Sequence, residues 1–306
     1  MLFGKIHHSG NKIKNGMKKY FCFLLTVVLL LSACGKNDKE NNMQTAKIQS
    51  VKTKNFEMRY ACFGSGEKTI VLFPGLYTKS LMPLAENVAQ YYERFTADYT
   101  VYMFDRVETP PEGYTIENMA DDNIKVLDSL KINNAYVIGI SMGGMIAQTV
   151  AVKREGLVKK LFLGSTACKT DVESELAVST WISLALKGDE EALNQAFAES
   201  VYSEGFYQQY REEILSSLKG ATKADLKRFA VLAGGIKGFD ISARLSKIKC
   251  PVFCIGADGD KIFGAKPSQE IAQKTSGKYF IYENYGHAVY DEAPDYLERI
   301  EKFFKE

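Results

Sequence analysis

A serine and a histidine in this 306-residue chain have the surroundings that nucleophilic catalysis requires. Ser141 lies at the centre of the pentapeptide Gly139-Ile140-Ser141-Met142-Gly143. His287 is the only histidine beyond the N-terminal segment, and Gly286 before it lets its loop approach another segment closely. A serine hydroxyl is a weak nucleophile near neutral pH, so it requires a base such as this imidazole to take its proton. The pattern predicts acyl transfer through Ser141, with His287 as the base.

A carboxylate must hold the imidazole in the correct tautomer and stabilise its charged form. The strand predicted over Pro251 to Gly256 is followed by two acids, Asp258 and Asp260. Either could supply the carboxylate from the end of that strand, and their spacing does not separate them. The aspartate that does not contact the imidazole is expected to bond nearby backbone amides in a turn.

The negative charge that forms on an attacked carbonyl oxygen requires two amide donors. A helix that begins directly after Ser141 aims its free amides at this charge, so Met142 is predicted to supply one donor. The second is predicted to be the amide of Leu76, because the first long apolar strand ends there in the turn Pro74-Gly75-Leu76. An ordinary strand-ending turn is the alternative interpretation.

Short apolar runs alternate with helical patterns along most of the chain, which is typical of parallel strands buried on both faces. The runs are Ile70 to Phe73, Val101 to Phe104, Tyr136 to Gly139, Leu161 to Leu163, Val252 to Ile255 and Tyr279 to Tyr282. The segment from Phe56 to Phe63 is predicted to add an antiparallel edge. Thr115 is predicted to cap a helix over Ile116 to Leu130. This alternation implies an α/β fold with a mostly parallel sheet flanked by helices.

The pattern changes to consecutive helices between Ala167 and Arg244. These are predicted over Val172 to Lys187, Glu190 to Ser200, Phe206 to Lys219 and Lys223 to Leu232. We expect a helical lid over residues 168–244, inserted into a core formed by residues 47–167 and 245–306. Its aromatic side chains are expected mainly to form the core of the lid, although they could line an acyl pocket. They are Trp181, Phe197, Tyr202, Phe206, Tyr207 and Phe229.

Three stretches together resemble the α/β-hydrolase superfamily, specifically its lidded, esterase-like branch, from about Phe56 to the C-terminus. They are residues 139–148 around the serine, residues 244–251 before the acid strand, and Gly286-His287 followed by Glu292-Ala293-Pro294. The resemblance implies the α/β-hydrolase fold and favours Asp260 as the catalytic acid, with Asp258 as the alternative. The chain differs from the family at Pro74, where a histidine is usual, and at residues 107–111, where a glycine-rich turn is common.

The resemblance also implies a reaction, which is hydrolysis of a small carboxylic ester through an acyl-enzyme intermediate, without a metal or a cofactor. Carbon–carbon hydrolysis, amide hydrolysis and cofactor-free peroxidation are alternatives on the same fold. A non-catalytic lipoprotein that binds a ligand in the same pocket is a third hypothesis. Serine at position 141 argues against dehalogenases, which carry aspartate there.

The N-terminal segment predicts export. Residues 1–33 contain five lysines and no acids, and their apolar run, Tyr20 to Leu31, is too short to span a bilayer, as in a signal peptide. Leu31-Ser32-Ala33-Cys34 resembles a bacterial lipobox, which implies a lipid on Cys34 and a location outside the cytoplasm, anchored to a bacterial membrane. An ordinary signal peptide is the alternative. Residues 34–46 are expected to form a flexible tether, and Met17 is an alternative start to Met1.

Charge and cysteine usage narrow the possible partners. The chain has 39 Lys and Arg against 37 Asp and Glu, and because five of the lysines lie in the leader, the remaining protein is mildly acidic. No basic stripe remains to bind nucleic acid, so membrane contact is expected from the lipid alone. Cys250 and Cys254 are four residues apart on one predicted strand, about 13 Å, which is beyond disulfide reach. Cys62 and Cys168 have no assigned role.

Overall fold

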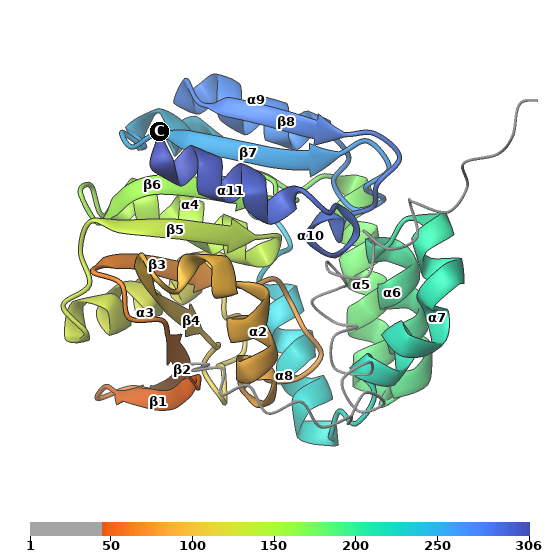
Figure 1. The fold of residues 1–306 in the computed structure, drawn as a ribbon. Helices are drawn as coiled ribbons and strands as arrows, with labels where there is room; N and C mark the ends of the chain where they lie inside the picture. The colour runs from red at the N-terminus through yellow and green to blue at the C-terminus, as the bar shows by residue number, and fades with distance from the viewer. Residues whose placement is uncertain (1–44) are drawn as a thin grey trace, which may run out of the picture.

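The computed structural model describes residues 45–306, which form an eight-stranded, mostly parallel sheet with helices on both faces (Figure 1). The strands are β1 (Lys47–Lys52), β2 (Glu57–Phe63), β3 (Lys68–Phe73), β4 (Tyr99–Phe104), β5 (Ala135–Ile140), β6 (Val158–Gly164), β7 (Val252–Ala257) and β8 (Lys278–Tyr282). Their order in the sheet is β1-β2-β4-β3-β5-β6-β7-β8. The β1–β2 and β2–β4 pairs are antiparallel, and every later pair is parallel. The predicted fold class is confirmed.

The antiparallel edge of the sheet contains one strand more than the sequence pattern predicts. β1 pairs with β2 from Lys47↔Cys62 to Lys52↔Glu57, so β2 lies inside the sheet and β1 forms its edge. Nearly all side chains of β1 are exposed. A strand with so little buried surface lacks the apolar run by which the inner strands are recognised.

Two hydrophobic cores lie on opposite faces of this sheet, one under α3, α4 and α9 and the other under α2 and α11. The bounds are α2 (Ala85–Tyr91), α3 (Ile116–Ser129), α4 (Met142–Lys153), α9 (Lys266–Thr275), α10 (Val289–Glu292) and α11 (Tyr296–Lys305), with single turns η2 (Met82–Leu84), η3 (Glu93–Phe95) and η4 (Ser242–Lys247). The predicted cap of α3 is confirmed, because Thr115 Oγ1 accepts a hydrogen bond from the amide of Asn118. Both faces of the central strands are thus buried, which fixes the strand ends where the site forms.

Four helices follow β6 and precede β7, without an intervening strand. They are α5 (Val172–Lys187), α6 (Glu190–Val201), α7 (Glu204–Leu218) and α8 (Lys223–Gly234). In Figure 1 they lie beyond the arrowheads of β5 and β7, so this insertion faces the carboxyl edge of the sheet. Within it Phe197 packs between Trp181 and Phe229, with ring centroids 4.9 and 6.2 Å away. These aromatic side chains are buried and contribute to the core of the insertion.

The expected signal peptide (residues 1–33), Cys34 and residues 35–44 of the expected tether lie outside the described residues. Between residues 45 and 306 no helix combines the length and the apolar character needed to cross a membrane. The cysteines of this part, Cys62, Cys168, Cys250 and Cys254, are all free thiols.

Candidate active site

Ser141 occupies a strained turn between β5 and α4. Its backbone has φ 51° and ψ −121°, a combination that a residue with a side chain rarely adopts. Two hydrogen bonds hold it there, since its amide donates to Gly164 O at 2.9 Å and its carbonyl accepts from Thr166 Oγ1 at 2.7 Å. Gly164 is the last residue of β6, and Thr166 lies two residues beyond it. The neighbouring strand therefore keeps the serine hydroxyl at the carboxyl edge of the sheet.

Two glycines make this turn sterically possible. A Cβ on Gly143 would lie 2.0 Å from Phe73 O and 2.4 Å from Pro74 O, which no side chain can accept. A Cβ on Gly139 would lie 2.7 Å from the Cβ of Ala147 on α4. Gly143 thus lets the turn after β3 pack directly on the start of α4, and Gly139 lets α4 pack on β5.

A continuous hydrogen-bonded chain joins Ser141, His287 and Asp260. Ser141 Oγ lies 2.9 Å from His287 Nε2, and His287 Nδ1 lies 2.8 Å from Asp260 Oδ2. His287 and Asp260 are only 2% and 6% exposed. The other oxygen of Asp260 accepts the amides of Ile262 at 2.8 Å and Phe263 at 3.0 Å, so these bonds fix the position of the carboxylate. The structure brings the predicted serine, histidine and acid together.

Asp258, the alternative acid, has a different environment. It is exposed, and its Oδ1 accepts the amide of Asn284 at 2.7 Å, at the start of the loop that leads to His287. It makes the kind of turn contact expected of the aspartate that does not orient the imidazole. Asp260 is therefore the acid in contact with the ring.

The two predicted oxyanion donors, Leu76 and Met142, border one small cavity of about 20 Å³. Within residues 45–306, no protein acceptor takes a hydrogen bond from either amide. Gly75 of the same turn lies against the nucleophile, since a Cβ there would be 3.4 Å from Ser141 Cβ. At Pro74, where the family usually has histidine, the carbonyl oxygen accepts a hydrogen bond from Arg106 Nη2 at 2.5 Å. A buried arginine thus supports this turn.

The loop that carries His287 is tied to the junction of α6 and α7. The amide of Ala288 donates to Val201 O at 2.7 Å. Glu292 Oε1 accepts the amides of Ser203 at 2.9 Å and of Gly286 at 3.3 Å. Burial raises the pKa of the Glu292 carboxyl above its ordinary value, although these amides oppose the shift. The position of His287 consequently depends on the inserted helices.

Sequence reasoning missed a group of charged residues beside the oxyanion turn, namely Asp105, Arg106 and Arg228. All three are buried. Arg228 belongs to α8, where Leu226, Phe229 and Ala230 are also buried. An arginine on the apolar face of a helix is the one signal that could have marked it, because charged side chains are almost never fully buried without a partner.

Groups of three or more His, Cys, Asp and Glu side chains that could hold a metal ion do not occur in the part of the chain that the structure describes.

Fold and site together define a hydrolase of the α/β class, with Ser141 after the central strand β5 in contact with His287 and Asp260, which follow β8 and β7. The model of the alpha/beta hydrolase family matches residues 70–300. The chain belongs to this family.

Relatives and solved structures agree with this assignment. A protein of Agrobacterium fabrum named as a carbamate hydrolase, RutD, is 26% identical over 237 residues, which cover 74% of this chain and 88% of the relative. The 3-oxoadipate enol-lactonase 2 of Acinetobacter baylyi is 22% identical over 220 residues, or 71% and 80% of the two chains. The crystal structure of an alpha/beta hydrolase enzyme from a Medee basin deep-sea metagenome library superposes with a TM-score of 0.75 at 20% identity, covering 84% and 98%.

Proposed function

We propose that this protein is a serine hydrolase that cleaves a small carboxylic ester through an acyl-enzyme intermediate. The observation that carries the proposal is the unbroken contact chain from Ser141 Oγ through the His287 ring to Asp260 Oδ2. No other side chain is needed to generate the nucleophile. The acid, the base and the nucleophile have the relative positions that acyl transfer requires.

The roles of the atoms follow from the contacts. Asp260 accepts a hydrogen bond from the Nδ1–H group of His287, which leaves the Nε2 lone pair to take the proton of Ser141. Ser141 Oγ attacks the ester carbonyl, and the amides of Leu76 and Met142 stabilise the negative charge that forms on its oxygen. His287 then gives its proton to the departing alcohol. A water molecule, activated by the same imidazole, releases the carboxylic acid and restores the serine.

Two further candidate substrate classes are favoured by the names of the relatives. Carbamates and lactones carry a carbonyl that the same serine could attack, and the relatives described above are named for these two classes. We propose the ester first, because hydrolysis of an acyclic ester requires no contacts in the site beyond those described. A substrate panel of acyclic esters, lactones and carbamates at equal concentration ranks the classes by kcat/KM.

Covalent labelling tests the nucleophile directly. A fluorophosphonate probe should label the full chain at Ser141, and the Ser141→Ala variant should be neither labelled nor active. Ser165→Ala is a matched control, since Ser165 also follows a strand and has positive φ (45°) but its hydroxyl has no hydrogen-bond partner within residues 45–306. Labelling that persists in Ser141→Ala would contradict the proposal.

We also propose that the protein is exported and carries lipid on Cys34. The support is the sequence pattern at residues 1–34 alone, and the catalytic body described above is independent of it. The experiment for this proposal concerns the whole molecule and is given in the Discussion.

A further inference from the structure

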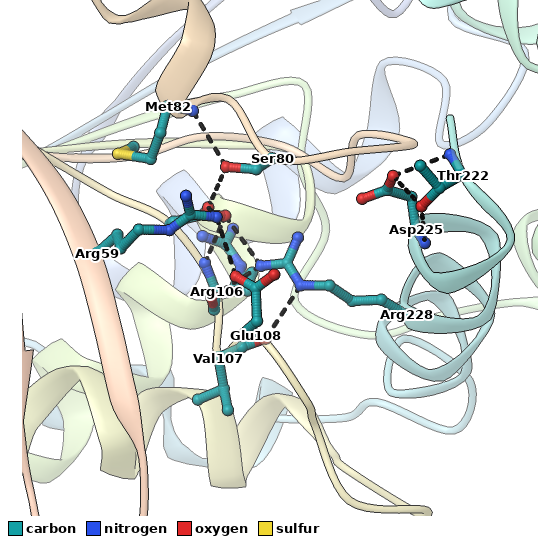
Figure 2. Close-up of polar contacts among 10 residues, drawn as sticks. Arg59, Ser80, Met82, Arg106, Val107, Glu108, Thr222, Asp225 and Arg228 are labelled. Carbon is teal, nitrogen blue, oxygen red and sulfur yellow. Dashed lines mark hydrogen bonds and ion pairs between the residues drawn. The ribbon is translucent and has the colours of Figure 1, made fainter. Parts of the chain in front are cut away.

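A group of buried charges lies beside the oxyanion turn, and Figure 2 shows Arg228 of α8 reaching from its helix toward Arg106 and Val107 of the loop after β4. Arg228 of α8 donates through Nε to Val107 O at 3.0 Å, and through Nη2 to Asp105 Oδ1 at 3.0 Å and Arg106 O at 2.7 Å. Arg106 in turn donates to Pro74 O. Asp105, Arg106 and Arg228 are 6%, 6% and 8% exposed. One connected set of contacts therefore joins the inserted helix, the loop after β4 and the oxyanion turn.

The charges of this group do not balance. Two buried guanidinium groups face a single buried carboxylate, Asp105, whose other oxygen already accepts the hydroxyl of Ser80. Glu108, the other acid of this loop, is exposed and pairs with Arg59 at 2.9 Å. Burial lowers the pKa of Arg106 to about 10; Asp105 opposes this shift and the nearby Arg228 adds to it. Arg106 therefore remains charged at neutral pH, and the two buried guanidinium side chains outnumber the one buried carboxylate.

Some hydrogen-bond donors of the two arginine side chains have no acceptor among the described residues. Within residues 45–306, Arg106 Nε is buried and has no acceptor. Arg228 Nη1 also makes none of the bonds given above, but it is not among the fully buried donors. A buried donor such as Arg106 Nε is costly unless an acceptor reaches it. The free capacity and the excess charge both call for an anion.

The cavity that these arginines border is also lined by the two residues predicted to donate to the oxyanion. Its walls include Leu76, Met142, Lys79, Asp105, Arg106 and Arg228. At about 20 Å³ it has room for about one water molecule. A carboxylate is larger than a water molecule, so its entry requires the side chains around this cavity to move. Because Leu76 and Met142 line the same cavity as the arginines, a group bound there would lie near the amides proposed to bind the carbonyl oxygen.

We propose that this cavity is a subsite for a carboxylate of the substrate, held by Arg106 and Arg228 a short distance from the carbonyl that Ser141 attacks. The inference rests on the proposed function and narrows its substrate class to esters that also bear a free carboxylate, such as half-esters of short dicarboxylic acids. An anion here supplies the missing countercharge and an acceptor for the free guanidinium nitrogens. A neutral ester of the same length leaves the subsite unfilled.

Matched pairs of esters test the subsite. The monomethyl esters of malonic, succinic and glutaric acids are compared with the corresponding dimethyl esters. Because charge-assisted hydrogen bonds are worth more than neutral ones, the best half-ester should exceed its diester in kcat/KM by about tenfold to a hundredfold. Arg228→Gln should reduce this ratio to about one, and Arg228→Lys should restore part of it. Because each ratio is taken within one protein, a smaller folded fraction cancels.

Arg59→Gln is the matched control. Arg59 lies 3.9 Å from Asp105 but its side chain is 41% exposed, and it does not border the cavity. This variant should keep the wild-type preference for half-esters. A wild-type ratio near one, a ratio unchanged in Arg228→Gln, or the same loss in Arg59→Gln would overturn the proposal.

Binding to the Ser141→Ala variant separates this inference from the proposed function. Calorimetric titration with monomethyl succinate should show binding that Arg228→Gln weakens about tenfold or more, and dimethyl succinate should bind less tightly. If half-esters bind in this way but the wild type hydrolyses no ester, the subsite stands and the reaction is wrong. If the wild type hydrolyses both esters equally and binding shows no dependence on Arg228, the reaction stands and the subsite is wrong.

Discussion

At the scale of single residues, Asp260 and Asp258 show how two carboxylates of one loop come to differ. Asp260 is buried against the ring of His287 and accepts two amides, whereas Asp258 is exposed and accepts the amide of Asn284. Only the first can hold the imidazole tautomer that leaves Nε2 free to take a proton. Substitution of Asp258 is therefore a matched control for substitution of Asp260.

We expect Asp260→Asn to lower kcat by about three to four orders of magnitude, because an amide cannot favour the required tautomer or stabilise the charged ring. Asp258→Asn should stay within a few-fold of the wild type. Steady-state kinetics on one ester, with fluorophosphonate labelling to count active sites, measures both. Equal losses in the two variants would contradict the assignment of the acid.

Glu292 should make folding stability depend on pH. Burial raises its pKa in the folded state above the ordinary value of 4.5, so the folded protein binds more protons than the unfolded chain between these two values. The contribution of this group to stability therefore falls as pH rises through that window. Glu292→Gln keeps an acceptor for Ser203 and Gly286 but no charge. Its Tm relative to the wild type should be higher at pH 7.5 than at pH 4.5.

Thermal unfolding of both proteins at the two pH values gives this difference. Glu298→Gln, an exposed glutamate on α11, is the control and should show the same relative Tm at both. A Glu292→Gln protein that loses relative stability at pH 7.5 would mean that the charge of the carboxylate stabilises the loop.

The site could be predicted from the sequence to the extent that its residues stand in local patterns. Ser141 is surrounded by glycines that only a sharp turn requires, and His287 has no competitor in the body of the chain. The choice between the two aspartates needed the resemblance, because both follow the same strand. Arg228 could not be paired with Asp105, since the two are 123 residues apart and nothing local links them.

At the scale of elements, the active-site edge depends on the close contact between α4 and the turn after β3. Gly143 is the point of contact, where a Cβ would lie 2.0 Å from Phe73 O. Backbone atoms cannot give way as a flexible side chain can. The oxyanion turn and the nucleophile turn are therefore one structural unit.

Gly143→Ala should lower the free energy of unfolding by at least about 2 kcal/mol and displace the oxyanion turn. Gly205→Ala on α7 is the control, because a Cβ there meets nothing within 4 Å. In a helix this change should be neutral or stabilising by up to about 1 kcal/mol. Urea denaturation gives both values. A Gly143→Ala protein as stable and active as the wild type would contradict the contact described.

Elements were predictable where their ends carry chemical signals. The helix α5 begins and ends as the sequence pattern predicts, because Asp171 caps its start and Gly188 adopts a left-handed conformation (φ 72°) after its end. The strand β1 was missed because it buries almost nothing and is stabilised by backbone pairing to β2. Backbone hydrogen bonds do not require particular side chains, so the sequence pattern does not indicate them.

At the scale of the whole molecule, residues 45–306 form a hydrolase fold, and the proposal of export concerns residues 1–34. The proposed lipid on Cys34 predicts that the protein, expressed from its full reading frame in a bacterium, incorporates an alkyne-tagged fatty acid and sediments with membranes. Cys34→Ser should abolish both. Cys62→Ser should change neither, because Cys62 lies on β2 within the sheet. A soluble, unlabelled wild-type protein would contradict the proposal.

The chain positions of Ser141 and His287 have a consequence for biogenesis. The two lie 146 residues apart, on opposite sides of the inserted helices, and meet only after β7 and β8 have joined the sheet behind β6. An incomplete or still extended polypeptide consequently has a hydroxyl with no base beside it. We therefore expect turnover during refolding to begin only once the inserted helices, β7 and β8 are in place, so the onset of turnover should report the assembly of this half of the fold.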